Sequence, residues 1–248
     1  MLTFETRAKC LKYAEDNGYF AVFLKDGGTL QNLMSGHVIP FLIESMVKHA
    51  EAKSIPKIIL SFSGKAGAGK NTAATLVAKI CSEMQSKYTV IEYSFAAYLK
   101  QMAKEQYGWD GDKTLYPDDV TDKGRNLLIW LAKKYRDEDP DFWARHLIDD
   151  VIDEHIRATH RDKKCMYIIT DTRYRNEIQL LRELEEFYQG EVKLYCLKVT
   201  RPNELHIDSP SEKDLDSFFG FDLTIQNNGS MEQLKENLKD FLDSIGGI

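Results

Sequence analysis

The stretch KIILSFSGKAGAGKNT, residues 57–72, joins an apolar run to a glycine-rich loop. The run KIILSF (57–62) is typical of a buried strand, and NTAATLVAKICSEMQ (71–85) has the apolar spacing of a helix. Between them lies the pattern GxxxxGK, which in a strand–loop–helix context is the phosphate-binding P-loop. A strand-to-helix turn without a ligand is the plainer alternative, and the full pattern in this context argues against it. The stretch therefore predicts a nucleotide-binding site.

The chemistry of this loop follows from its residue types. Glycines allow backbone conformations that point successive N–H groups inward, and the helix adds its unpaired N-terminal donors. Lys70 would bring a positive charge to the β- and γ-phosphates of ATP. Asn71 stands where the usual motif has Ser or Thr, so its amide oxygen is the expected contact to Mg²⁺, directly or through water. The predicted nucleotide-binding residues are Gly64, Ala66, Gly67, Ala68, Gly69, Lys70, Asn71 and Thr72.

From residue 57 onward, predicted strands and helices alternate along the chain. Such alternation favours the α/β class, with a parallel sheet that helices cover on both faces. The predicted strands are 57–62, 89–95, 165–170, 192–199 and 223–227, and the predicted helices are 71–85, 96–108, 124–136, 140–157, 176–188 and 231–245.

A domain boundary is expected at AEAKSIP, where Pro56 interrupts a helical pattern just before the first of these strands. Residues 1–55 are then a small N-terminal appendage of unknown role, and residues 56–248 are the P-loop domain. The pattern of the appendage predicts a helix at 5–18, a strand at 19–25, a turn at Gly27 and Gly28, and a helical region to about Lys53.

Composition limits the classes of function that remain. The 248 residues carry a net charge of −6, with a pI near 5.6, so the chain as a whole is poorly suited to bind nucleic acid. The four cysteines form no CxxC pair and are expected to be reduced thiols. The start MLTFETRAKC has no secretory pattern and no stretch is apolar enough for a membrane span, so a cytoplasmic protein is expected. Small-molecule nucleotides are its expected partners, and a homodimer stays open.

A second group of charged residues follows the predicted strand CMYIIT (165–170). Asp171 would lie at the carboxyl end of this strand, where ligands bind in open α/β sheets, and would hold Mg²⁺ directly or through water. Arg173 and Arg175 would reach phosphate oxygens. The alternative for Asp171 is a structural one, as the cap of a helix that begins near Tyr174.

A third group follows the predicted strand 192–199. The segment from Arg201 to about residue 222 has the character of a lid that excludes water, with an ordinary surface loop as the alternative. Arg201 is the candidate to stabilise charge on the moving phosphoryl group, and His206 is a weaker candidate for the substrate. Near the C-terminus, Ser230 with Gln233 predicts a capping box, and the backbone at Asn228 would border the adenine ring.

The candidates for acceptor binding lie on or beside the helical stretches between residues 97 and 160. A monophosphate acceptor needs cationic side chains, and Lys100, Arg125 and Arg136 are the candidates, although charged helix faces are more often simply solvated. Phe142 and Trp143 could stack on a base, but core packing is the favoured reading for both.

Six motifs occur in a fixed order along the chain: GKAGAGKNT, FAAYLK, DPDFWARHL, DTRYRNEI, VTRP followed by His206 and Ser211-Glu212, and NNGSMEQL. Together they resemble the deoxynucleoside monophosphate kinases of tailed bacteriophages, within the P-loop nucleoside monophosphate kinase group, from about Pro56 to the C-terminus. The resemblance implies a three-layer fold with a five-stranded parallel sheet in the order 2-3-1-4-5. It also implies a helical acceptor-binding insert at about 97–160, and for a phage protein a location in the host cytoplasm.

The resulting hypothesis is an ATP- and Mg²⁺-dependent kinase of a deoxynucleoside monophosphate. Its catalytic residues would be Lys70, Asp171, Arg173 and Arg201, its metal contacts Asn71 and Asp171, and its substrate contacts Lys100, Arg125, Arg136, Arg175 and His206. Two alternatives remain: a P-loop kinase of another small metabolite, and a nucleotide-binding switch that catalyses little.

Overall fold

The computed structural model describes residues 2–4, 7–16, 19–24, 27–32, 38–43, 57–117, 120–160, 163–202 and 209–246. The chain divides into two compact units, Met1–Ile55 and Pro56–Ile248, and each is described here by itself.

The N-terminal unit contains a four-stranded sheet and one described helix, α1 (Arg7–Asp16). Its strands are β1 (Leu2–Phe4), β2 (Tyr19–Leu24), β3 (Gly27–Asn32) and β4 (Val38–Ile43), in the order β1-β4-β3-β2. Strand β1 runs parallel to β4, whereas β2, β3 and β4 are antiparallel neighbours.

The predicted helix at 5–18 and strand at 19–25 are confirmed over the described residues 7–16 and 19–24. The prediction of a turn at Gly27 and Gly28 followed by helix is wrong over residues 27–32 and 38–43, which are strands. Gly28 pairs with Phe23 on β2 and with Phe41 on β4, so the two neighbouring strands supply the hydrogen bonds that a helix would have supplied internally. The prediction for residues 44–53 lies outside the described residues.

The unit from Pro56 to Ile248 is built on a five-stranded sheet. Its strands are β5 (Lys57–Ser63), β6 (Thr89–Tyr93), β7 (Cys165–Thr172), β8 (Val192–Thr200) and β9 (Leu223–Gln226). All neighbours in the order β6-β7-β5-β8-β9 are parallel. Counted from β5 as strand 1 of this unit, that order is 2-3-1-4-5, as the resemblance implied.

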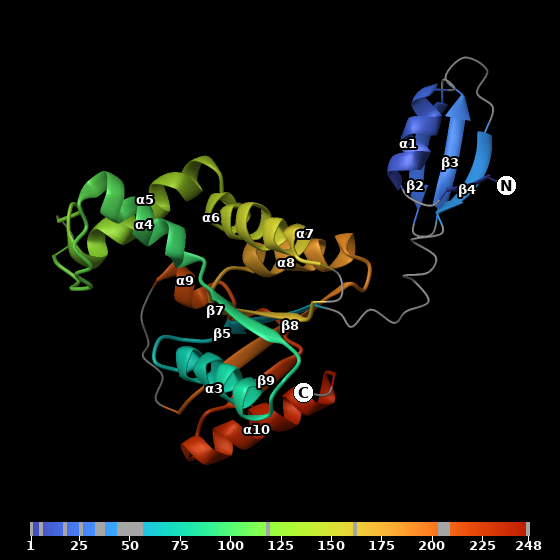
Figure 1. Cartoon of the computed structure of the whole chain (residues 1–248). Helices are drawn as coiled ribbons and strands as arrows, with labels where there is room; N and C mark the ends of the chain where they lie inside the picture. The colour runs from blue at the N-terminus through green and yellow to red at the C-terminus, as the bar shows by residue number, and fades with distance from the viewer. Residues whose placement is uncertain are drawn as a thin grey trace. The chain divides into compact units, whose positions relative to one another are not determined.

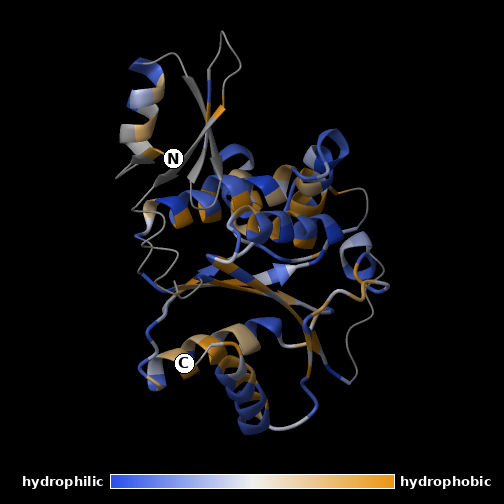
Figure 2. Cartoon of the chain, turned by 90° about the vertical axis from the view of Figure 1, so that its right-hand side faces the viewer, coloured by the Kyte–Doolittle hydropathy of each residue, from blue (hydrophilic) through white to orange (hydrophobic). Residues whose placement is uncertain are grey.

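Helices cover both faces of this sheet (Figure 1). Helices α3 (Lys70–Glu83) and α10 (Met231–Ser244) pack on one face. The other face carries α6 (Phe142–Arg145), the π-helical segment η1 (His146–Asp153), α7 (Glu154–Ala158) and α8 (Arg175–Phe187). Figure 2 shows the apolar strands between the two helical layers. The α/β three-layer prediction is confirmed.

The central strand β5 contributes to both cores because its side chains alternate. Ile58, Leu60 and Phe62 lie in the core beneath α3 and α10, while Ile59 lies in the core beneath α8. All four are buried, which is why the run reads as continuously apolar in the sequence.

A third core belongs to the helices α4 (Ala96–Tyr107), α5 (Gly124–Glu138) and α6. Its buried residues are Met102, Ala103, Trp109, Leu127, Leu131 and Trp143. Trp143 is 3% exposed and its indole N–H donates to the Ala132 carbonyl, so the core-packing interpretation of Trp143 is correct. All four cysteines are buried.

Candidate functional site

The loop between β5 and α3 has the backbone shape that its glycines predict. Gly64 has φ +144, and a side chain there would come within 2.2 Å of the Val199 carbonyl oxygen on β8. Gly69, at the start of α3, has φ +100, in the left-handed region that favours glycine. The loop therefore lies close to β8 and leads directly into a helix N-terminus.

Lys70 folds back over this loop. Its Nζ donates to the carbonyl oxygens of Gly64, at 2.7 Å, and Lys65, at 2.9 Å, and the residue is buried. These carbonyls hold the ammonium group at the mouth of the loop. Asn71 is exposed and Thr72 is partly exposed at the start of α3.

Asp171 lies at the end of β7, as predicted, but its hydrogen bonds go to another helix than expected. Its carboxylate accepts from Ser94 Oγ at 2.7 Å, Phe95 N at 2.8 Å and Ala96 N at 3.1 Å. It thus caps α4, and the alternative that it caps the helix beginning near Tyr174 is wrong. A carboxylate offers about four acceptor positions, so three donors leave room for one more, such as a metal-bound water.

The turn after β7 is held by Glu177, a residue that the sequence analysis did not single out. Its Oε2 accepts from the backbone N–H groups of Arg173, at 2.7 Å, and Tyr174, at 3.0 Å. Burial raises the pKa of this carboxyl from 4.5 to about 7, although the two backbone hydrogen bonds act in the opposite direction. Glu177 therefore fixes the direction in which Arg173 leaves the strand.

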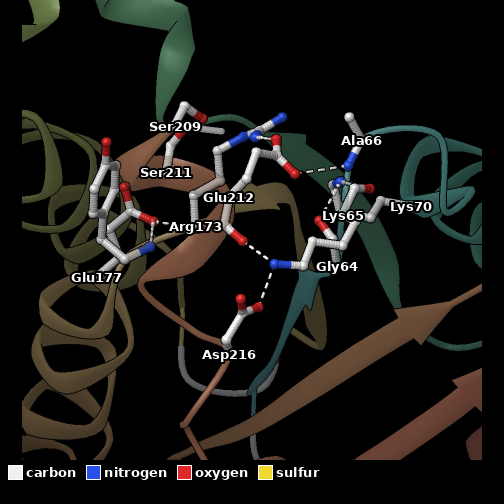
Figure 3. A network of polar contacts seen from close by, with 11 residues as sticks. Gly64, Lys65, Ala66, Lys70, Arg173, Glu177, Ser209, Ser211, Glu212 and Asp216 are labelled. Carbon is white, nitrogen blue, oxygen red and sulfur yellow. Dashed lines mark hydrogen bonds and ion pairs between the residues drawn. The ribbon is translucent and has the colours of Figure 1, made fainter. Parts of the chain in front are cut away.

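The Arg173 side chain points toward the phosphate loop and meets Glu212 (Figure 3). Glu212 lies on the short helix α9 (Pro210–Lys213), which the sequence analysis did not predict. Its Oε1 pairs with Arg173 Nη1, and its Oε2 accepts from Ala66 N at 2.8 Å. Residues 209–222 of the predicted lid are thereby in direct contact with the phosphate loop, through Glu212.

Two further cations join this segment to the site. Lys65 Nζ donates to the Glu212 carbonyl and pairs with Asp216. Arg175 donates through Nε to the Asp214 carbonyl at 2.9 Å and through Nη2 to Ser217 Oγ. Arg175, predicted to reach substrate, is thus bound to the lid segment in this structure.

A cavity of about 140 Å³ lies beneath this contact. Its walls come from the ends of β5, β7 and β8 and from the lid segment. The lining residues include Ser63, Arg173, Lys198, Thr200, Glu212 and Phe221. Ser63 Oγ is buried and has no hydrogen-bond partner among the described residues. The cavity therefore adjoins both the phosphate loop and the arginine that follows β7.

On the C-terminal side of the loop, Asn227 makes a contact that the sequence analysis did not predict. Asn227 Nδ2 donates to the Ala68 carbonyl at 2.9 Å. Asn228 is exposed beside it, and the contact of its backbone with the adenine ring stays a prediction. The neighbouring cap of α10 is confirmed, because Gln233 N donates to Ser230 Oγ at 3.3 Å. Arg201 is exposed at the end of β8, and His206 lies outside the described residues.

The predicted acceptor residues are spread over the helical insert. The Arg136 guanidinium lies 4.3 Å from the centre of the Tyr174 ring, next to the turn that carries Arg173. Lys100 lines a shallow hollow on α4 with Gln101 and Lys104, and Arg125 is exposed at the start of α5. Only Arg136 of these three is brought to the β7 turn by a described contact.

No group of three or more His, Cys, Asp or Glu side chains within the described ranges is arranged to hold a metal ion. Phosphate-bound Mg²⁺ does not need such a group, because it usually retains waters and takes only one or two protein ligands. Asp171 and Asn71 fit such water-mediated contacts.

The parallel sheet with its phosphate loop, the buried lysine and the arginine facing that loop define the class of P-loop nucleotide-binding proteins. The family model described as phosphomevalonate kinase matches residues 62–187, about half of the chain, and the chain belongs to this family. It is therefore a P-loop kinase, a phosphotransferase related to nucleotide kinases.

A curated relative points to the same class. The "Putative deoxynucleotide monophosphate kinase" of Acanthamoeba polyphaga mimivirus is 26% identical over 203 residues, which cover 75% of this chain and 97% of that protein. The resemblance to deoxynucleoside monophosphate kinases is thus confirmed with a viral relative.

Similar solved structures include the APS kinase of Mycobacterium tuberculosis, with 13% identity and a TM-score of 0.41 over 76% of this chain and 99% of that one. A gluconokinase from Sinorhizobium meliloti 1021 has 15% identity and a TM-score of 0.40 over 77% and 93%. These TM-scores are low, so the fold assignment depends on the strand order and the loop described above. None of the helices in the described ranges has the length and apolar character that crossing a bilayer would require.

Proposed function

We propose that this protein transfers the terminal phosphoryl group of ATP to a deoxynucleoside monophosphate, giving ADP and the deoxynucleoside diphosphate. The proposal depends on two elements that lie next to each other: the phosphate loop with Lys70, and Arg173 at the end of the neighbouring strand β7. Glu212 contacts both of them. The viral relative named as a deoxynucleotide monophosphate kinase supports this acceptor class.

The donor phosphates would be bound by the inward N–H groups from Gly64 to Thr72, with the N-terminus of α3 beneath them. Lys70 would exchange the carbonyl acceptors of Gly64 and Lys65 for the β- and γ-phosphate oxygens. Arg173, held by Glu177, would stabilise charge on the phosphoryl group as it moves, together with Arg201 from the end of β8. Mg²⁺ would neutralise phosphate charge, with Asn71 and Asp171 contacting its waters.

The acceptor would bind between the carboxyl ends of β6 and β7 and the helical insert at about 97–160. Arg136 is the best-placed cation for its phosphate, because its stacking on Tyr174 brings it beside the Arg173 turn. Lys100, Arg125, Arg175 and His206 remain proposed contacts. Transfer would be in line and without a covalent enzyme intermediate, since positioning and charge neutralisation account for such reactions.

A second candidate is a kinase of phosphomevalonate, favoured by the description of the family model that matches residues 62–187. Both acceptors present a phosphate to cationic side chains, so the donor site is the same in the two cases. They differ in the base, which only the nucleotide would place against the aromatic side chains of the insert.

The deciding experiment is an acceptor screen by coupled ADP release with ATP and Mg²⁺. The four deoxynucleoside monophosphates, their ribonucleotides and phosphomevalonate are compared at equal concentration, and a deoxynucleoside monophosphate is expected to give the fastest turnover. Saturable turnover with phosphomevalonate alone would replace the first proposal by the second. ATP binding without acceleration by any acceptor would favour the nucleotide-binding switch.

The donor site is tested with Lys70→Met in the same assay. Loss of one charged contact in the transition state is expected to lower kcat about 10²–10⁴-fold. Lys79→Met is the matched control, because Lys79 lies on the same helix, is exposed and pairs only loosely with Glu83 at 3.8 Å. Near wild-type turnover of Lys70→Met would contradict the assignment.

A further inference from the structure

The buried carboxylate of Glu212 lies in the phosphate site itself. Its side chain is 2% exposed although it belongs to the four-residue helix α9 of the lid segment. One oxygen accepts from the Ala66 backbone N–H of the phosphate loop, and the other pairs with Arg173 (Figure 3). Both donors are ones that the proposed function assigns to phosphate oxygens.

A carboxylate resembles the end of a phosphate group closely enough to use such donors. It is a compact anion with two acceptor oxygens, and charge-assisted hydrogen bonds to N–H and guanidinium groups are short and strong. Burying a carboxylate is costly unless it is paired, so the positive potential of the site is what holds Glu212 there. Glu212 is thus an internal anion on donors that an external phosphate would also use.

This arrangement is incompatible with a bound triphosphate. A terminal phosphate that reached Ala66 N and Arg173 would come into contact with the Glu212 oxygens. Neighbouring anions that share two donors repel each other, and neither can keep both partners. Since the phosphate carries more charge and more acceptor oxygens, Glu212 is the group that has to leave.

We propose that Glu212 is a placeholder for the terminal phosphate of a nucleoside triphosphate, which displaces it and releases the lid segment from the phosphate loop. The inference depends on the proposed donor site but not on the identity of the acceptor. It makes docking of residues 209–222 and nucleotide binding mutually exclusive at Ala66 and Arg173. After product release, Glu212 returns and keeps the loop and Arg173 paired.

The placeholder reduces the apparent affinity of the site for a nucleoside triphosphate, because nucleotide binding has to compete with the docked lid segment.

Replacing Glu212 by Gln keeps the shape of the side chain and removes the charge that pairs with Arg173. The dissociation constants of ATP and of inorganic tripolyphosphate are measured by isothermal titration calorimetry for the full chain, with and without Mg²⁺. Glu212→Gln is expected to bind both ligands about tenfold more tightly than the wild type.

Glu236→Gln is the matched control. It makes the same substitution at an exposed glutamate of α10, for which no described contact to the phosphate loop or the lid segment exists. Its dissociation constants are expected to stay within about twofold of the wild type, since exposed charges contribute little. Thermal unfolding of each variant establishes that it is folded, and Glu212→Ala serves as a second variant if Glu212→Gln is not.

The outcomes separate this inference from the proposed function. Unchanged or weaker binding by Glu212→Gln would overturn the placeholder, because Glu212 would then stay in place with nucleotide bound. Equal tightening by Glu212→Gln and Glu236→Gln would overturn it too, in favour of general electrostatics. Absence of binding by every variant would refute the donor site and the placeholder together. Tighter binding with no deoxynucleotide turnover would support the placeholder and refute the acceptor assignment.

Discussion

The buried carboxyl of Glu177 makes a specific prediction about stability and pH. It accepts the backbone N–H groups of Arg173 and Tyr174, and its pKa is raised to about 7 because it is removed from water. The perturbation is Glu177→Gln, which preserves the size of the side chain and one oxygen that can accept from both groups. The variant therefore removes the titration while leaving the local packing nearly intact.

The magnitude follows from the two pKa values. The folded value of about 7 exceeds the unfolded value of 4.5 by about 2.5 units, and at about 1.4 kcal/mol per unit this amounts to about 3 kcal/mol. Because the folded pKa is raised, the folded state keeps a proton that the unfolded state has released. The stabilising contribution is therefore complete below pH 4.5 and is lost as the pH rises through 7.

The measurement is urea unfolding of the wild type and Glu177→Gln at several pH values from 4.5 to 8.5. The free energy of unfolding of the wild type, relative to the variant, is expected to fall by about 3 kcal/mol across this range. Taking the difference at each pH cancels the titration of all other groups. A difference that stays constant with pH, or rises with it, would refute the reasoning that burial dominates over the two backbone hydrogen bonds.

Three further variants test the site as a structure. Gly69→Ala is expected to weaken ATP binding and lower thermal stability, because its side chain would lie 2.3 Å from Asn227 Nδ2 at φ +100; unchanged calorimetry and melting would contradict this. Asp171→Asn is expected to cost about 1–3 kcal/mol in urea unfolding, since an amide cannot accept all three donors from Ser94, Phe95 and Ala96. Ser63→Ala is expected to leave the free energy of unfolding within about 0.5 kcal/mol of the wild type, because its hydroxyl lines the cavity and breaks no described hydrogen bond when removed; a loss of more than about 1 kcal/mol would disprove it.

The fold of the P-loop unit could be predicted to a large extent because its signals are local. The run from Lys57 to Phe62 places apolar residues on both faces, and the GxxxxGK loop that follows it directly marks it as a strand. The N-terminal unit shows the opposite case. VIPFLI at residues 38–43 is too short to distinguish helix from strand by periodicity, and its pairing with β3 decided the outcome.

Some residues of the functional site could likewise be predicted from local signals, and others could not. The position of Arg173 at the ligand-binding edge of the sheet could be predicted, because ligands bind at the carboxyl ends of parallel strands. The role of Glu212 could not be predicted from the sequence, because its contact with Ala66 joins residues that are 146 positions apart. The contact of Asn227 with the Ala68 carbonyl was not predicted, since it joins residues 159 positions apart and no local signal says which amide turns toward the loop.

The sequence by itself determined that a phosphate loop joins a buried strand to a helix, because glycine spacing, one lysine and apolar periodicity act within a few residues of each other. The tertiary structure alone decided that Asp171 caps α4, that Glu177 holds Arg173, and that Glu212 occupies the loop from the lid segment. Those contacts depend on which parallel strands become neighbours. Strand order brings distant carboxylates to the same N–H groups, and a linear pattern of residue types does not encode that pairing.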